Sequence, residues 1–400
     1  MITTDEFFES PRSWSLLKYR VLDGYLAAYF PKVNQAYLRP AVAADLFAGR
    51  GRFEDGTEGS PLIIARHAKY WGEKLRYRNQ VVLAEVKAED REILVENMKD
   101  FINEGIAVII PGDALDVGQV LLERIKPGVP LFVFLDPFGL KGLSMKLLME
   151  IFRRAKQEST EVLINFNHRA IARRLGVCRK VNDPRHQIRK LAETTIEFTN
   201  DILGGSWWQA IMNDTSVSED ARVELIRKKY VNIYASNFPH IGTMPVTQGL
   251  PGESVKYFLI FASRSQVAFE LMNDVMKKAW FQFMLEVINE QNVGTLFQDS
   301  TPQQFATSET ATKLEALAEE VFEEAVRLVR TQAPYYRKIS DIPLRRREVR
   351  IGLISRQFAR YTCSEYNDAI KMLLQKGRLV APDNRVRISD NVAFALGESA

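Results

Sequence analysis

Acidic residues stand at the ends of four successive apolar runs of the chain, where β-strands would end. Asp45 ends the first run and precedes the turn Gly49-Arg50-Gly51, and Glu85 ends the second run. Asp113 and Asp136 follow the third and fourth runs, in the turns GDA and DPFG. If the runs are parallel strands of one open sheet, their carboxyl ends form a single rim, where such sheets bind ligands.

The Gly-x-Gly turn after Asp45 allows the backbone to approach a ligand closely. Glu54 does not complete the G-x-G-x-x-G pattern of a dinucleotide site, so no pyrophosphate cradle is predicted. An acidic residue before a short glycine turn suits a ligand with a cationic amino-acid end and no phosphate, such as S-adenosylmethionine (SAM). The residues expected to hold its amino-acid end, ribose hydroxyls and adenine are Asp45, Phe47, Gly49, Gly51, Glu85 and Asp113, together with Lys18 on an N-terminal helix.

Simpler interpretations remain open for three of these residues. Glu85 and Asp113 could be the N-caps of the helices that follow them, because carboxylates are favoured at that position. Lys18 could reach the carboxylate of SAM or be an exposed lysine of its helix.

The turn Asp136-Pro137-Phe138-Gly139 is the candidate for the reaction itself. In enzymes that methylate amino groups of nucleic-acid bases, an Asp/Asn-Pro-Pro-aromatic turn accepts hydrogen bonds from the target amine and stacks on the extruded base. Asp136 and Pro137 match this pattern, whereas Phe138 takes the second Pro position and Gly139 the aromatic one. We expect Asp136, Pro137 and Phe138 to be catalytic, with Phe138 either stacked on a base or in the core.

Other polar and aromatic residues are candidates for the same crevice. Asn165, Asn167 and His168 come at the end of the fifth apolar run, although His168 is expected to pack or cap a helix rather than act as a base. The Trp207-Trp208 pair and Phe238 could wall a substrate cleft, or belong to the core as aromatic pairs usually do.

Alternating apolar runs and amphipathic stretches must position these residues. The expected strands are 41–47, 80–85, 106–110, 131–136 and 161–166, with helices at 14–30, 61–75, 87–103, 114–125 and 144–156. This alternation predicts an α/β fold with a parallel sheet covered on both faces. A mostly helical insert, residues 168–241, precedes two strands at 243–247 and 255–263 and a helix at 266–289. We therefore expect one domain over residues 1–300 and a connecting helix in 301–333.

Residues 334–400 have the element pattern of a small winged helix-turn-helix domain. A helix at 344–359 precedes one that is capped by Thr362 or Ser364 and ended by Gly377. A hairpin is then expected to join residues 378–380 to 385–388.

Basic residues gather in this C-terminal segment. From Tyr335 to Ala400 the chain has 13 Lys/Arg and 7 Asp/Glu, whereas the net charge of the whole chain is +4. Such an excess attracts nucleic-acid phosphates, although a winged helix can also dock onto a protein. The residues expected to contact nucleic acid are Arg345, Arg346, Arg347, Lys371, Arg378, Arg385 and Arg387.

The composition excludes several other classes of protein. Hydrophobic residues make up 46% and charged residues 26% of the chain, which is typical of a globular protein. Two cysteines and four scattered histidines do not indicate a built-in metal site. The first residues are acidic where a signal peptide is basic, and no apolar run reaches about 18 residues. We therefore expect a cytoplasmic protein without a metal.

The chain resembles the prokaryotic three-Cys-motif partner family, within the SAM-dependent methyltransferase superfamily. The stretches that match are DLFAGRGRFEDGTEGSPLIIARHA, the GDA turn, FLDPFG, VLINF and YFLIFAS, preceded by a helix with Lys18 and Tyr25. The resemblance covers roughly residues 10–290 and implies a Rossmann-like methyltransferase fold. It also implies a partner protein that carries three cysteines.

These patterns together predict a SAM-dependent methyltransferase that acts on an amino group, plausibly of DNA or RNA, and works with the three-cysteine partner. The first alternative is a nucleic-acid-binding adaptor of that partner without catalytic activity. The second is methylation of a protein or a small molecule. Catalysis would consist mostly of positioning, since the sulfonium of SAM is already activated.

Overall fold

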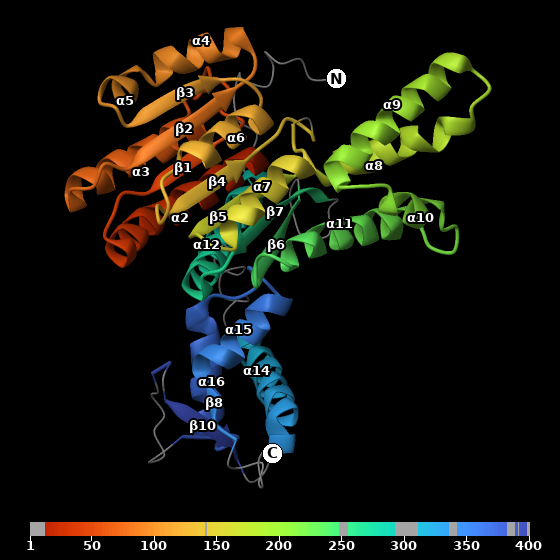
Figure 1. The fold of residues 1–400 in the computed structure, drawn as a ribbon. Coiled ribbons are helices and arrows are strands. Elements are labelled where there is room, and N and C mark those ends of the chain that lie inside the picture. The colour runs from red at the N-terminus through yellow and green to blue at the C-terminus, as the bar shows by residue number, and fades with distance from the viewer. Residues whose placement is uncertain are drawn as a thin grey trace. The chain divides into compact units, whose positions relative to one another are not determined.

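The computed structural model describes residues 13–140, 142–247, 255–292, 311–335, 342–381, 389–390 and 392–397. The chain divides into two compact units, Met1–Ala268 and Phe269–Ala400. Figure 1 labels the elements of both. Among the residues in the described ranges, no helix is long and apolar enough to cross a membrane.

The first unit is built around a seven-stranded sheet in the order β3-β2-β1-β4-β5-β7-β6. Strands β1 to β5 are parallel, whereas β7 runs antiparallel to both β5 and β6. This is the Rossmann order with one antiparallel strand added between β5 and β6. The strands are β1 (Val42–Asp45), β2 (Gln80–Glu85), β3 (Ala107–Pro111), β4 (Leu131–Leu135), β5 (Thr160–Phe166), β6 (His240–Thr247) and β7 (Val255–Ser263).

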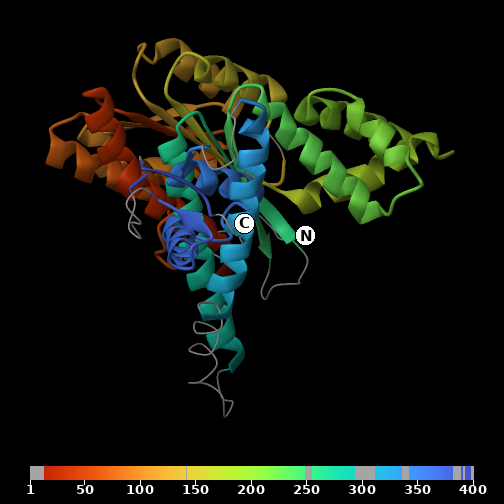
Figure 2. The same cartoon turned by 90° about the horizontal axis from the view of Figure 1, so that it is seen from below.

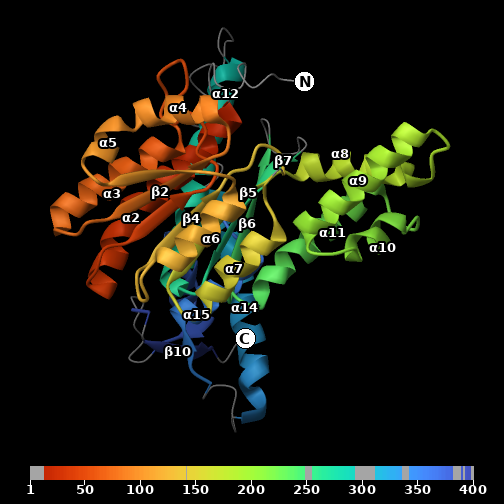
Figure 3. The ribbon, with the colours of Figure 1, turned by 45° about the horizontal axis from the view of Figure 1, so that its top comes forward.

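Helices cover both faces of this sheet, which confirms the α/β fold with a mostly parallel sheet. Successive β4 residues face opposite layers. Phe132 packs against Tyr25 of α2 with 5.6 Å between ring centroids, and Val133 belongs to the core that includes Leu147 of α7. Figure 3 shows α6 and α7 in front of the sheet. The helices are α2 (Ser13–Tyr37), α3 (Ser60–Leu75), α4 (Ala88–Asn97), α5 (Lys99–Asn103), α6 (Ala114–Arg124) and α7 (Met145–Ala155).

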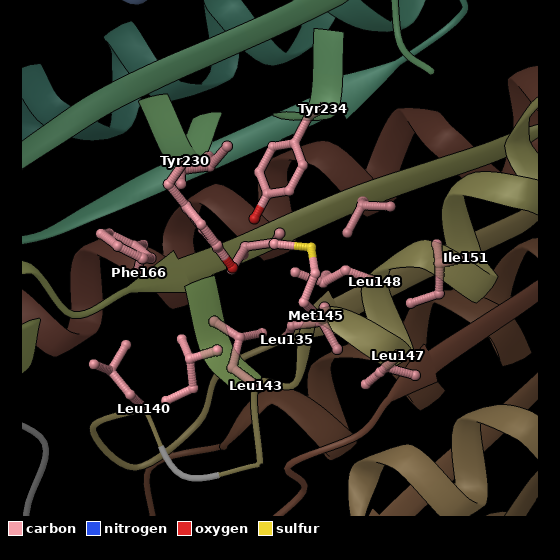
Figure 4. Packing of buried hydrophobic residues seen from close by; sticks show 14 of the residues in the cluster. Leu135, Leu140, Leu143, Met145, Leu147, Leu148, Ile151, Phe166, Tyr230 and Tyr234 are labelled. Carbon is pink, nitrogen blue, oxygen red and sulfur yellow. The ribbon is translucent and has the colours of Figure 1, made fainter. Parts of the chain in front are cut away.

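The expected insert between β5 and β6 is helical and packs on α7 through aromatic side chains. Its elements are α8 (His168–Cys178), the 3-10 helix η1 (Arg179–Asn182), α9 (His186–Leu203), α10 (Trp207–Asn213) and α11 (Glu219–Ala235). Tyr234 and Phe238 lie 4.8 and 5.4 Å from Phe152 of α7, measured between ring centroids. Figure 4 shows Tyr230 and Tyr234 beside Met145 and Leu148. Aromatic burial therefore fixes the insert to the sheet domain.

The second unit consists of helices and a small antiparallel sheet in the order β8-β10-β9. Thr362 caps α16 through a reciprocal pair of hydrogen bonds with Glu365, and Gly377 ends that region with φ +69°. The elements are α12 (Gln266–Asn292), α14 (Ala311–Gln332), η2 (Ala333–Tyr335), β8 (Leu344–Arg345), α15 (Arg346–Arg356), α16 (Cys363–Gln375), β9 (Leu379–Val380) and β10 (Ala393–Leu396).

The division between the units lies earlier than the boundary near residue 300 that we expected. Most of α12 belongs to the second unit because its polar side chains bond there. Asn273 donates to the Tyr361 carbonyl at 2.7 Å and accepts from the Ala359 N–H at 2.8 Å. These contacts join residues almost 90 positions apart, so local sequence patterns do not reveal them.

Among the described residues of the second unit, β9 pairs with a strand that we did not expect. The strand paired with β9 is β10, in the register Val380 to Ala395 and Leu379 to Leu396. Residues 385–388, where we expected the second strand, lie outside the described residues, and so do Arg385 and Arg387. Both candidates for the strand are short and contain β-branched or apolar residues, so propensity alone does not distinguish them.

Candidate functional site

The rim predicted from the sequence exists at the carboxyl edge of the parallel strands. β1 lies between β2 and β4, with Asp45 in register with Leu83 of β2 and Phe134 of β4. Glu85 ends β2 two residues beyond Leu83, and Asp136 follows β4. Because the three strands are parallel and adjacent, Asp45, Glu85 and Asp136 lie on one edge of the sheet.

Glu85 fastens the glycine turn to the second strand. Its Oε2 accepts a hydrogen bond from the Gly49 N–H at 2.9 Å, and its Oε1 accepts one from the Lys87 N–H at 2.8 Å. Gly49 and Gly51 have φ of +61° and +79°, a conformation that L side chains rarely adopt. The next anchor is the Gly51 carbonyl, which accepts from the Gly59 N–H at 2.9 Å, directly before α3. The turn is therefore held at Gly49 by the Glu85 side chain and at Gly51 by a backbone hydrogen bond.

A Gly51→Ala substitution should destabilise the first unit more than Gly56→Ala does. Both positions have positive φ, which costs a residue with a Cβ about 1–2 kcal/mol. A Cβ on Gly51 would also lie 2.9 Å from Leu94 Cδ1, whereas one on Gly56 would meet no atom within 4 Å. Urea unfolding of the two variants measures the difference. Equal losses of stability would show that Leu94 moves aside freely.

Asp45 is completely buried and accepts a hydrogen bond from the backbone at the start of the turn. Its Oδ1 accepts from the Phe47 N–H at 3.0 Å, whereas its Oδ2 has no hydrogen-bond partner. Burial raises the pKa of Asp45 to about 7. The Ser60 side chain also hydrogen-bonds to this carboxyl and partly offsets the effect of burial on its pKa. With an exposed fraction of 0%, Asp45 meets a ligand only if its covering atoms move.

The other predicted cofactor residues are closer to solvent. Asp113 is exposed and is the N-cap of α6, where its Oδ1 accepts from the Leu115 and Asp116 N–H groups at 2.9 and 3.0 Å. Phe47 is half-buried. Sequence analysis missed Val86, a large apolar side chain that is exposed directly after Glu85. An apolar residue after an acidic strand end is the signal that could have identified it.

The predicted catalytic carboxylate lies in a buried polar cluster. Lys18 Nζ donates to Asp136 Oδ2 at 2.5 Å, and Asn165 Nδ2 donates to Oδ1 at 2.6 Å. The Lys18 and Asp136 side chains are only 6% and 11% exposed. Burial is the largest single effect and works against the Lys18 ammonium, but the charge and hydrogen bond of Asp136 together with Tyr19 and Tyr257 outweigh it and raise the pKa of Lys18. Lys18 is therefore a positive charge held on Asp136, and the expectation of an exposed helix lysine is wrong.

Two tyrosines surround this ion pair. The Lys18 ammonium lies 4.9 Å from the centroid of the Tyr19 ring. Burial raises the pKa of Tyr19 to about 12 and raises that of Tyr257 of β7 as well. Both tyrosines therefore remain neutral at physiological pH and act as hydrogen-bonding or packing groups. Neither was singled out in the sequence, because their proximity to Asp136 depends on the packing of α2 and β7.

Phe138 projects from the turn beside this cluster. Pro137 is buried, but Phe138 is 70% exposed, so the alternative that Phe138 belongs to the core is wrong. Gly139 has φ +77°, which turns the chain directly after the exposed ring. An exposed aromatic ring next to a buried carboxylate is an arrangement that can stack on a planar ligand.

Residues at and directly after the end of β5 divide between the cluster and the insert. Asn165 bonds to Asp136, and Asn167 is the N-cap of α8, accepting from the Ala170 N–H at 2.9 Å. The insert aromatics do not wall a cleft. Trp208 and Phe238 are buried in the core, and Trp207 is half-buried with its Nε1 bonded to the Leu203 carbonyl.

Acidic side chains within the second unit pair with three of the five described cations that were predicted to bind nucleic acid. Arg346 bonds to Asp390 and Arg347 to Glu270, each at 2.8 Å. Arg378 bonds to Glu319, and its guanidinium lies 3.9 Å from the centroid of the Phe322 ring. Glu270 and Glu319 come from α12 and α14, outside the segment whose charge excess we counted. The excess in residues 335–400 is therefore balanced inside the unit.

Arg345 and Lys371 differ from these paired arginines. In the described part of the chain neither has an ion-pair partner, and Arg345 is exposed. These two residues remain accessible to a phosphate.

No protein-family model and no curated protein sequence matches the chain. Several solved structures are similar to it. An O-methyltransferase from Bacillus cereus in complex with SAH is 14% identical, with a TM-score of 0.32 and coverage of 60% of this chain and 80% of that chain. The fibrillarin pre-rRNA processing protein of Methanococcus jannaschii is 13% identical, with a TM-score of 0.30 and coverage of 56% of this chain and 66% of that chain. Likenesses this low carry no argument about the site of this chain.

Proposed function

We propose that this chain is a SAM-dependent methyltransferase that transfers a methyl group to an amino group of a nucleic acid. The observation that carries the proposal is the joined rim of β1 and β2, where Glu85 holds the left-handed Gly49 turn at 2.9 Å. A Rossmann-order sheet binds its ligand at this edge. The glycine turn lacks the length of a pyrophosphate cradle, which favours a nucleoside without phosphates.

The residues of the rim suit the parts of SAM. Glu85 would accept from the ribose hydroxyls, since each of its oxygens keeps a further lone pair beyond its backbone hydrogen bond. Val86 and Asp113 would contact the adenine. Asp45 would act through the turn that it holds at Phe47. When bound, SAM supplies an activated methyl group, so the chain needs only to bind and orient the acceptor.

The DPFG turn supports an acceptor with a planar face. Phe138 would stack on a base, and the adjacent Pro137 carbonyl would accept from its amino group. Asp136 is already bonded to Lys18 and Asn165. It would therefore position this turn electrostatically rather than bind the amine with a free oxygen.

The same ion pair favours one alternative function. If Asp136 serves only to neutralise Lys18, the chain is a non-catalytic adaptor that binds nucleic acid together with a three-cysteine partner. The partner itself is proposed from the family resemblance. The order α14, β8, α15, α16, β9 and β10, with β10 in the middle of the sheet, supports a winged helix as the second unit.

Calorimetric titration with SAM distinguishes the enzyme from the adaptor. The proposal expects saturable binding at or below millimolar SAM, and it is wrong if none is found. Phe138→Ala should then leave SAM affinity unchanged and reduce methyl transfer to nucleic acid roughly 5- to 150-fold, since base stacking contributes about 1–3 kcal/mol. Tyr70→Ala, which removes another exposed aromatic ring of the same unit, is the matched control. Equal activity of both variants would exclude stacking by Phe138.

A further inference from the structure

The positive charge of this protein is concentrated in one short segment of the first unit. The second unit, 269–400, contains 18 Lys/Arg and 18 Asp/Glu and is neutral, so the net charge of +4 belongs to the first. Residues 169–190, which we call the basic arm, contain eight Lys/Arg and one acid, Asp183. The arm alone therefore carries +7, and the rest of the first unit carries −3.

The basic arm consists of α8, η1 and the first turn of α9. In the three views of Figures 1, 2 and 3, α8 and α9 stand out from the side of the sheet. With about 1.5 Å per residue, the 11 residues of α8 span about 16 Å. A B-form duplex carries one phosphate of each strand per about 3.4 Å of helix axis, so α8 is long enough to lie beside more than one phosphate.

Three cations of the arm are available to a polyanion. Arg173, Lys180 and Lys190 are exposed, and in the described ranges none of them has an ion-pair partner. The only acid within the arm, Asp183, is bonded to Arg185 at 2.8 Å. The arm therefore presents more cations than its single carboxylate, which interacts with both Arg185 and Lys180, can neutralise.

The remaining exposed arginines of the arm are held only by surface ion pairs. Arg179, Arg185 and Arg189 pair with Glu219, Asp183 and Glu193, and their side chains are 36%, 71% and 45% exposed. Such pairs contribute little in water, about 0–1 kcal/mol, so a phosphate can replace the carboxylate. By contrast, Arg350 of the second unit is 5% exposed and held by Glu270 and Asp390. Its charge is not accessible to a ligand.

The arm begins at the candidate site. Asn165 bonds to Asp136, Asn167 caps α8, and the first arm residue follows two positions later. A chain of phosphates that lies on the arm is therefore led toward Asp136 and the exposed Phe138. In addition, no large apolar side chain is exposed within the arm as described, which disfavours a helix that inserts into a membrane surface.

We propose that the basic arm, and not the second unit, binds the sugar-phosphate backbone of a nucleic acid and directs one nucleotide to the DPFG turn. This inference deepens the proposed function and rests on it for the role of the turn. Binding by the arm comes from phosphate contacts, so it is independent of sequence and decreases with salt. The proposal thus gives the helical insert the role that the sequence suggested for the C-terminal segment, namely the binding of nucleic-acid phosphates by basic side chains.

Two matched charge reversals test this assignment. Arg173→Glu/Lys180→Glu changes the arm, and Arg345→Glu/Lys371→Glu changes two described cations of the second unit that were expected to contact nucleic acid and have no ion-pair partner. Each pair replaces one arginine and one lysine and alters the net charge equally. The probes are fluorescein-labelled single-stranded DNA and RNA of one sequence, and the DNA duplex, titrated by anisotropy at about 50 and 200 mM salt. Thermal unfolding verifies that both variants are folded.

The arm variant should lose at least tenfold in affinity, and its slope of log K against log salt should decrease by about two phosphate contacts. The second-unit variant should stay within about twofold of the unchanged protein. The titrations with DNA and with RNA decide which nucleic acid is preferred. Equal losses in both variants, a larger loss in the second-unit variant, or binding only to anionic vesicles or acidic peptides overturns the proposal.

Calorimetry with SAM on the same variants separates the two hypotheses. Loss of nucleic-acid binding in the arm variant with normal SAM binding supports both. If the unchanged protein binds nucleic acid through the arm but binds no SAM, the arm stands and the methyltransferase proposal fails. If it binds SAM and the arm variant binds nucleic acid normally, only the arm proposal fails.

Discussion

An Asp136→Ala substitution should destabilise the first unit by about 3–5 kcal/mol. The substitution leaves the Lys18 ammonium in a site where it is only 6% exposed and has lost the anion that raised its pKa. Breaking a buried ion pair at one partner is costly because the remaining charge is desolvated without compensation. The loss should exceed that of the Gly51→Ala variant.

The Lys18→Met/Asp136→Ala double variant provides the control. It removes the stranded charge, so it should be more stable than Asp136→Ala alone even though it carries one more substitution. Urea unfolding of the two single variants and the double variant measures the coupling. A double variant whose loss equals the sum of the single losses would show that the ion pair contributes nothing.

This result bears on how activity measurements are interpreted. An Asp136→Ala protein that fails to transfer methyl groups could have lost its fold at the site rather than a catalytic carboxylate. Phe138→Ala avoids the problem because its side chain is 70% exposed and contributes little to the core. The function of the turn is therefore tested at Phe138 and its structural role at Asp136.

The contribution of the buried Asp45 to stability should decrease as the pH rises from about 4 to about 7. The pKa of Asp45 is raised to about 7 from an ordinary value of 3.8, so the folded state keeps a proton that the unfolded state releases. Stability from such a group is fully present below the unfolded pKa and is lost as the pH rises through the folded pKa. Over this window the loss is roughly 4 kcal/mol.

Asp45→Asn isolates this contribution. Like the protonated carboxyl, the amide is neutral and carries a donor, so the variant should match the unchanged protein near pH 4. Near pH 8 it should be more stable by up to roughly 4 kcal/mol. Chemical unfolding at both pH values measures the difference. A difference that stays constant with pH would mean that Asp45 does not titrate in this window.

Glu161→Gln is an independent comparison. Burial raises the pKa of Glu161 to about 7 as well, with Tyr25 as its hydrogen-bond donor. Relative to the unchanged protein, the Glu161→Gln variant should also become more stable as the pH rises. Glu161 lies at the start of β5 and Asp45 at the end of β1, so the two effects should add.

The sequence by itself determined the sheet and the edge at which the acids gather. The β4 strand, LFVFL, is apolar throughout because both faces of a parallel strand are covered. Parallel strands bring their carboxyl ends to one edge, so Asp45, Glu85 and Asp136 could be grouped before their neighbours were known. These features depend on local periodicity and on a chain-direction rule.

Only the tertiary structure decided which charges are used and which are neutralised. Lys18 meets Asp136 across 118 positions, and Glu270 meets Arg347 and Arg350 across about 80. A count over residues 335–400 could not include Glu270 or Glu319, because those acids lie on helices outside that range. Local sequence patterns are enough to predict which side chains are buried. Ion pairs, in contrast, depend on which distant residues the packing brings within a few ångströms of each other.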